Sequence, residues 1–185
     1  MSKSIYLINP ASDYPSYLGA EFYAGWGGEP VVNNADLATT TIAGMLPKDF
    51  NVSICEEHVM PVDFEIDVDY VGMTGKVSQR RRMIALAKEF RRRGKTVIIG
   101  GPYASLSPEV LRPHCDILVR GEVEEIFDQI CDDLRTSRWK PEYEGNKVDL
   151  SNCAIPRWEK YPNHRARVGT LQTSRGCPFD VNSAT

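Results

Sequence analysis

Short apolar runs alternate along this chain with longer segments whose apolar residues repeat at helical spacing. The runs predict five strands, at residues 5–8, 51–55, 69–73, 96–99 and 116–119. The segments between and after them predict helices at residues 36–46, 78–93, 107–111 and 122–134. The clearest helix is 78–93, and Ser78 is its predicted cap. In this helix Met83, Leu86, Ala87 and Phe90 share one face, and Gly94 provides a natural stop.

Strands that alternate with helices predict an α/β fold with a doubly wound, five-stranded parallel sheet, flavodoxin-like or Rossmann-like. We expect the strand order 2-1-3-4-5, with strands numbered along the chain, and ligand binding at the carboxyl ends of the strands. In residues 136–172, strand patterns and helix patterns do not alternate in this way. The pattern therefore predicts one α/β domain over residues 1–135 and an irregular extension over residues 136–185.

The loops that follow the third, fourth and fifth strands carry the candidate binding residues. Glycines there let a bulky, flat ligand approach the backbone, and the hydroxyl groups of Thr74, Ser78 and Ser105 can bond to amide groups at its rim. The candidates are Thr74, Gly75, Lys76, Val77, Ser78, Gly100, Gly101, Pro102, Tyr103, Ser105, Gly121 and Glu122. A tight strand-to-helix turn is the competing interpretation of Gly100-Gly101-Pro102.

Composition narrows the class of protein. The chain has 185 residues, 42% of them hydrophobic, and a net charge of -3, which gives no reason to expect nucleic acid as a partner. No stretch approaches the roughly 18–20 apolar residues of a membrane span, and the N-terminus lacks a signal-peptide pattern, so we expect a cytoplasmic protein. The five cysteines are widely spaced with no Cys-x2-Cys pair, which argues against a disulfide framework and a zinc site.

Two further segments leave alternatives open. Residues 10–34 form a long loop rich in glycine and aromatic residues, which favours a packed, functional loop over disorder. The run Arg80-Arg81-Arg82 opens a predicted helix, where positive charge opposes the helix dipole. An anion bound nearby would explain this run, but a solvated helix face is the favoured explanation.

An ordered set of motifs resembles a known family. Gly-Gly-Pro-Tyr-x-Ser starts at Gly100, Val-Arg-Gly-Glu-x-Glu follows at Val119, Ile-Pro-Arg-Trp at Ile155, and Thr-Ser-Arg-Gly-Cys-Pro at Thr173. This order is similar to that of the B12-binding radical S-adenosylmethionine (SAM) proteins. The resemblance implies a cobalamin-binding domain over residues 1–135, followed by a linker and the start of a radical SAM core.

The resemblance also implies roles for individual residues. Thr74 corresponds to a hydroxyl near the corrin, Gly100 and Gly101 to a diglycine beside the nucleotide tail, and Gly121 and Glu122 to the loop after the last strand. The cobalamin motif Asp-x-His-x-x-Gly is absent, because the loop after the first strand contains no histidine. We therefore expect cobalamin as the cofactor and partner, without a histidine ligand from that loop.

The tail departs from the family pattern. Radical SAM proteins hold a [4Fe–4S] cluster with Cys-x3-Cys-x2-Cys, and here those positions are Cys177, Val181 and Ala184. Cys177 is the single remaining cluster-ligand position, so neither the cluster nor SAM is expected to bind this chain.

The resemblance predicts the cobalamin-binding module of a methyltransferase-type radical SAM enzyme, inactive without its barrel. The alternative is a stand-alone, non-catalytic carrier or interaction domain with a flavodoxin-like fold. A receiver domain is less favoured, because Asn9-Pro10 and Thr74 stand where that fold needs acidic residues.

Overall fold

A parallel sheet organises the chain in the computed structural model, which describes residues 2–15, 20 and 25–175. The sheet has six strands in the order β3-β1-β4-β5-β6-β7, and every neighbouring pair is parallel. Its strands are β1 (Lys3–Asn9), β3 (Phe50–Glu56), β4 (Tyr70–Thr74), β5 (Thr96–Gly100), β6 (Ile117–Arg120) and β7 (Glu142–Glu144). A separate parallel pair joins β2 (Val32–Asn34) to β8 (Ala166–Val168).

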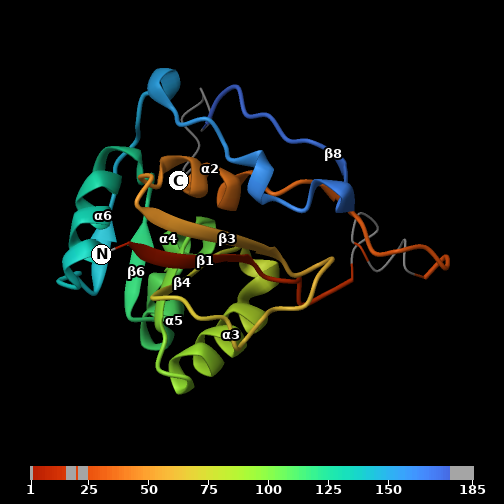
Figure 1. Cartoon of the computed structure of the whole chain (residues 1–185), viewed down its shortest axis with the longest axis horizontal. Helices are drawn as coiled ribbons and strands as arrows, with labels where there is room; N and C mark the ends of the chain where they lie inside the picture. Colours follow the sequence, from red (N-terminus) through yellow and green to blue (C-terminus); the bar gives the residue numbers. More distant parts are fainter. Residues whose placement is uncertain (1, 16–19, 21–24, 176–185) are drawn as a thin grey trace.

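Helices cover both faces of the sheet (Figure 1). The α-helices are α2 (Leu37–Met45), α3 (Arg80–Arg92), α4 (Pro102–Leu106), α5 (Pro108–Leu111) and α6 (Phe127–Thr136). Short 3-10 helices are η1 (Val77–Gln79), η2 (Arg112–His114), η3 (Glu124–Ile126), η4 (Leu150–Asn152), η5 (Trp158–Lys160) and η6 (Asn163–Arg165). Helices α2 and α6 lie on one face, and α3, α4 and α5 pack on the other.

The alternation of side chains along the central strand divides the core in two. Ile5 and Leu7 of β1 pack in the cluster that contains α2 and α6. Tyr6 and Ile8 point the opposite way, into the cluster that contains α3. A strand with helices on both faces must be apolar at every position, which is why these strands appear in the sequence as unbroken apolar runs.

The predicted fold class is confirmed, with one more strand in the sheet than expected. The five predicted strands correspond to β1, β3, β4, β5 and β6, and their spatial order is the predicted 2-1-3-4-5. The sequence patterns did not predict β2, β7, β8 or α4. Because β7 comes from the segment expected to be irregular, the sheet extends past residue 135. The domain boundary itself stays a prediction.

Among the described residues, no helix combines the length and apolarity that crossing a membrane requires.

Candidate functional site: a cavity beneath the carboxyl ends of the strands

A cavity of about 1060 Å³ lies between the sheet and helices α2 and α6, and it reaches the carboxyl ends of the strands. Its floor is formed by strand residues, and its walls by apolar side chains of the two helices. The floor consists of Ile5, Leu7, Gly72, Ile98 and Val119, and the walls include Ile42, Met45, Phe127, Ile130 and Leu134. Ligand pockets in proteins usually have volumes of about 300–1,000 Å³, so this cavity is large enough for a cofactor.

Two residues of the central strands shape the floor of the cavity. Gly72 of β4 has no side chain on this face, and the side chain of Leu7 packs over it, because a Cβ atom there would lie 2.8 Å from Cδ2 of Leu7. Ile98 of β5 is only partly buried on this face, although its neighbours Val97 and Ile99 are fully buried on the other. The helices therefore pack closely on one face of the sheet at these positions and leave space over Ile98 on the other.

The predicted binding residues come together at the open end of this cavity. All of them except Val77 and Tyr103 line it. The side chain of Tyr103 is buried in the cluster around α3, and Val77 is 67% exposed. The structure thus gathers most of the predicted residues in one place, while their role in binding a ligand stays a prediction.

The loops after β4, β5 and β6 are held together by their own contacts. Ser105 accepts a hydrogen bond from the backbone N–H of Gly121 at 2.9 Å and donates one to the carbonyl oxygen of Gly101 at 3.2 Å. Gly101 has a φ of +89°, and a Cβ atom there would lie 2.3 Å from Oγ1 of Thr74. The hydroxyl of Ser105 and the glycine at 101 therefore have structural tasks, independent of any ligand.

The start of helix α3 differs from its prediction. Ser78 was expected to cap this helix, but the cap residue is Gln79, which makes no side-chain cap bond. Instead, the carboxylate of Asp13, in the loop after β1, accepts the backbone N–H groups of Arg81 at 2.9 Å and Arg82 at 3.0 Å. This carboxylate supplies the negative charge that the run of arginines suggested, so the run does not call for a bound anion.

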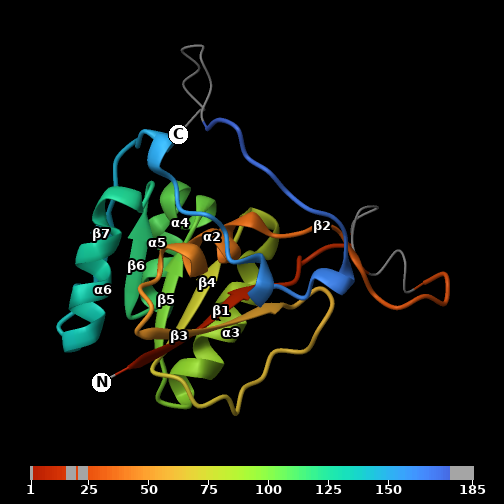
Figure 2. The same ribbon diagram turned by 45° about the horizontal axis from the view of Figure 1, so that its top comes forward.

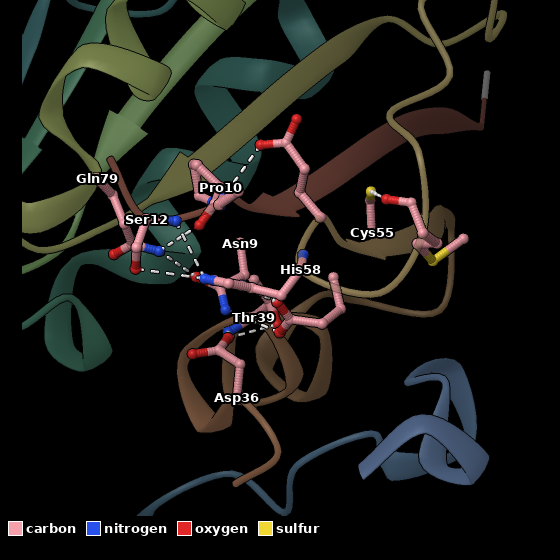
Figure 3. Close-up of polar contacts among 12 residues, drawn as sticks. Asn9, Pro10, Ser12, Asp36, Thr39, Cys55, His58 and Gln79 are labelled. Atoms are coloured by element: carbon pink, nitrogen blue, oxygen red, sulfur yellow. Dashed lines mark hydrogen bonds and ion pairs between the residues drawn. The ribbon is translucent and has the colours of Figure 1, made fainter. Parts of the chain in front are cut away.

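A buried polar cluster lines the cavity where β1 and β3 end (Figure 3). Glu56 is 1% exposed, and its carboxylate accepts hydrogen bonds from Asn9 at 2.8 Å and from the hydroxyl of Tyr161 at 2.9 Å. The Nδ1 atom of His58 lies 2.5 Å from the same carboxylate. The backbone N–H of Ser12 donates to Nε2 of His58 at 3.1 Å, which places the ring proton on Nδ1.

A second carboxylate, that of Asp36, caps helix α2 in the wall of the cavity. It accepts bonds from the backbone N–H and the hydroxyl of Thr39, at 2.8 and 2.7 Å. Burial raises the pKa of Asp36 above its ordinary value, and the negative charge of Glu56 acts in the same direction, while the bonds from Thr39 oppose the shift. The folded protein therefore binds this proton more tightly than the unfolded chain does.

We expect Asp36→Asn to stabilise the protein at pH 8 relative to the wild type. The free energy of unfolding of the wild type falls as the pH rises from about 4 through the raised pKa of Asp36. Asparagine cannot ionise and caps a helix about as well as aspartate. The difference in urea-unfolding free energy should vanish near pH 3, where Asp36 is protonated in both states. Asp36→Ala is the control, because it removes the cap and should cost about 1 kcal/mol. A stabilisation of Asp36→Asn that did not depend on pH would contradict this explanation.

Other predictions fall outside the described residues. Cys177, Val181 and Ala184 belong to the segment 176–185, which is not described. In the predicted loop of residues 10–34, residues 16–19 and 21–24 are not described either. Within the ranges that the structure does describe, no group of three or more histidine, cysteine or acidic side chains is arranged to hold a metal ion.

Several residues of the cavity were not predicted from the sequence. Gly72 and Ile98 read as ordinary strand residues, and only the spacing between sheet and helices reveals their role. Glu124 lies in the Val-Arg-Gly-Glu-x-Glu motif and Arg175 in the Thr-Ser-Arg-Gly-Cys-Pro motif, yet neither was predicted to be a binding residue. Both line the cavity, together with Thr170 and Gln172 of the C-terminal segment.

Comparison with known proteins gives several similar sequences. The chain is 29% identical over 155 residues to a bacteriochlorophyllide d C-8(2)-methyltransferase of Chlorobaculum tepidum, a match that covers 79% of this chain and 34% of that protein. It is 27% identical to a hopanoid C-2 methylase of Rhodopseudomonas palustris, over 75% of this chain and 27% of that protein. An uncharacterized methyltransferase of Synechocystis is 30% identical, over 77% of this chain and 27% of that protein. The chain is related to methyltransferases.

The match has a clear limit. The chain spans about a third or less of the length of these curated relatives. No family model matches the chain, and no solved structure matches it.

Proposed function

We propose that this chain is the cobalamin-binding part of a methyltransferase. The observation that carries the proposal is the apolar cavity between the sheet and helices α2 and α6, which opens among the loops after β4, β5 and β6. The similarity to methyltransferases and the resemblance of the ordered motifs to B12-binding radical SAM proteins support it. Ligand binding at the carboxyl ends of the strands is also the general rule for open parallel α/β sheets.

The chemistry of the cavity fits the two ends of cobalamin. Its deep part is lined largely by apolar side chains, with Leu7, Gly72 and Ile98 below and the two helices above. This part suits the flat benzimidazole of the nucleotide tail. The open end offers the hydroxyl of Thr74 and the amine of Lys76, which suit the amide groups at the edge of a corrin. When bound, cobalamin supplies a cobalt atom that can carry a methyl group.

The iron–sulfur cluster of the parent family does not fit this chain. Cluster irons are held by thiolates, and Val181 and Ala184 occupy two of the three positions where cysteines would be needed. The proposed role is therefore confined to cobalamin, and no radical step is assigned to these residues.

A test of the proposal is retention of colour. Purified protein mixed with hydroxocobalamin and desalted is expected to keep the corrin absorbance at about one cofactor per chain. Cobinamide, which lacks the nucleotide tail, should bind at least about tenfold more weakly, because the deep part of the cavity then stays empty. A colourless protein would overturn the proposal. Equal affinity for both compounds would show that the tail does not occupy the cavity.

A non-catalytic interaction domain is the second candidate, and exposed apolar side chains favour it. Val77 is 67% exposed, Leu106 is 60% exposed and Leu171 is 87% exposed. Failure to bind any corrinoid, combined with self-association in sedimentation velocity, would favour this second candidate.

A further inference from the structure

The C-terminal segment crosses the open end of the cavity. We call residues 166–175 the strap; it runs from β8 towards the loop after β6 (Figure 2). Its first end is fixed by the β2–β8 pair, by a bond from the backbone N–H of Ala35 to the carbonyl of Val168 at 3.0 Å, and by the hydroxyl of Thr170, which donates to Ala35 at 2.6 Å. Thr170, Gln172 and Arg175 of the strap all line the cavity.

The second end of the strap is fixed by Arg175. Its guanidinium forms an ion pair with Oε1 of Glu124, lies 3.6 Å from Oε2 of Glu122, and donates from Nε to Oε1 of Gln172 at 3.0 Å. Between the two ends the strap is open to solvent, and Leu171 is 87% exposed. The attachment of this end therefore depends largely on one guanidinium and two carboxylates on the opposite side of the opening.

The two carboxylate oxygens of Glu124 differ in their hydrogen bonding. Oε1 binds Arg175, whereas Oε2 is buried and has no hydrogen-bond partner within the part of the chain that the structure describes. Buried carboxylate oxygens almost always accept a hydrogen bond, and an unpaired one needs an explanation. Because Glu124 also lines the cavity, a donor on a ligand would supply the missing partner.

We propose that Glu124 binds a hydrogen-bond donor of the ligand through Oε2, while Arg175, bound to Oε1, closes the strap over that ligand. The ligand group is an amide N–H or a hydroxyl, because a carboxylate oxygen only accepts and the adjacent Glu122 disfavours an anion. The identity of the ligand as an amide-bearing corrinoid rests on the proposed function. The same carboxylate thus links occupancy of the cavity to closure of the strap.

The strap can be tested without any ligand by limited proteolysis with chymotrypsin. Arg175→Gln and Glu124→Gln should each speed cleavage after Leu171 by about tenfold or more, because one end of the strap is released. Glu125→Gln and Arg138→Gln are matched controls, since both side chains are exposed and neither lines the cavity. Wild-type cleavage rates in Arg175→Gln would overturn the closing role of Arg175.

Ligand binding tests the proposed contact between Glu124 and the ligand. Glu124→Gln should raise the Kd for hydroxocobalamin about tenfold or more, as expected for loss of a hydrogen bond to a charged group. Arg175→Gln should mainly speed dissociation. Cobalamin should slow cleavage of the strap in the wild type and fail to do so in Glu124→Gln. If the wild type binds cobalamin and Glu124→Gln behaves identically, only this inference fails. If the wild type binds none, the proposed function fails, and the ligand role of Glu124 fails with it.

Discussion

Ile98→Trp is expected to abolish cobalamin binding while leaving the fold intact. Ile98 lies on the floor of the cavity, so a larger side chain can extend into empty space instead of into packed neighbours. The indole would occupy the volume proposed for the nucleotide tail. We expect the affinity to fall at least about 100-fold, which corresponds to about 2.7 kcal/mol. Titration of the corrin absorbance measures the affinity, and urea unfolding measures the stability.

Ile99→Trp is the matched control on the next residue of the same strand. Ile99 is fully buried on the opposite face, in the cluster around α3. Adding volume to a packed core forces side chains and backbone to shift, and a change this large should cost on the order of 3 kcal/mol. Equal loss of stability in the two variants would show that the space above Ile98 is not open. Unchanged binding by Ile98→Trp would place the ligand elsewhere.

Gly121→Ala is expected to destabilise the protein by about 3 kcal/mol or more. Gly121 has a φ of +69°, which costs a residue with a Cβ atom roughly 1–2 kcal/mol. The added Cβ would also lie 2.1 Å from the carbonyl oxygen of Gly145, where the chain leaves β7. Because that atom is backbone, it cannot rotate away as a side chain would, so the loop and β7 must separate.

The control for this prediction is Gly94→Ala. Gly94 has a similar φ of +76°, but a Cβ there would meet nothing within 4 Å. It should therefore cost only the roughly 1–2 kcal/mol of the left-handed backbone. The difference between the two urea-unfolding free energies isolates the steric clash. If both alanine variants lost the same stability, the close approach of Gly121 and Gly145 would have no energetic importance.

The sequence predicted the central sheet well because its strands are buried on both faces. Such strands contain uninterrupted apolar runs, as β1, β4, β5 and β6 do. The edge strand β3 instead alternates in its first half, where Asn51 is exposed and Ser53 is partly buried. The edge strand β7 was not predicted, because its sequence is Glu-Tyr-Glu and only Tyr143 is buried. Strands β2 and β8 have three residues each and pair across most of the chain, so no local pattern marks them.

The site was predicted in part, for a physical reason. The carboxyl ends of neighbouring parallel strands meet at one edge of the sheet, so the loops containing Thr74, Gly101 and Gly121 could be grouped from the sequence. The cavity depends on the distance between the sheet and two helices, which no local pattern encodes. The incorrect cap at Ser78 has a similar cause, because the real partner of the helix, Asp13, is distant in the sequence.

The cavity above Ile98 has a consequence for the amount of protein that a cell can maintain. A protein that leaves part of its core unfilled forgoes some of the burial that stabilises a fold. Under the proposed function, free cofactor at 100 times its Kd would add about 2.7 kcal/mol to the stability of the folded state. Chains that stay unfolded longer are degraded faster. Supply of the vitamin would then set how many copies of this protein persist, as well as how many are loaded.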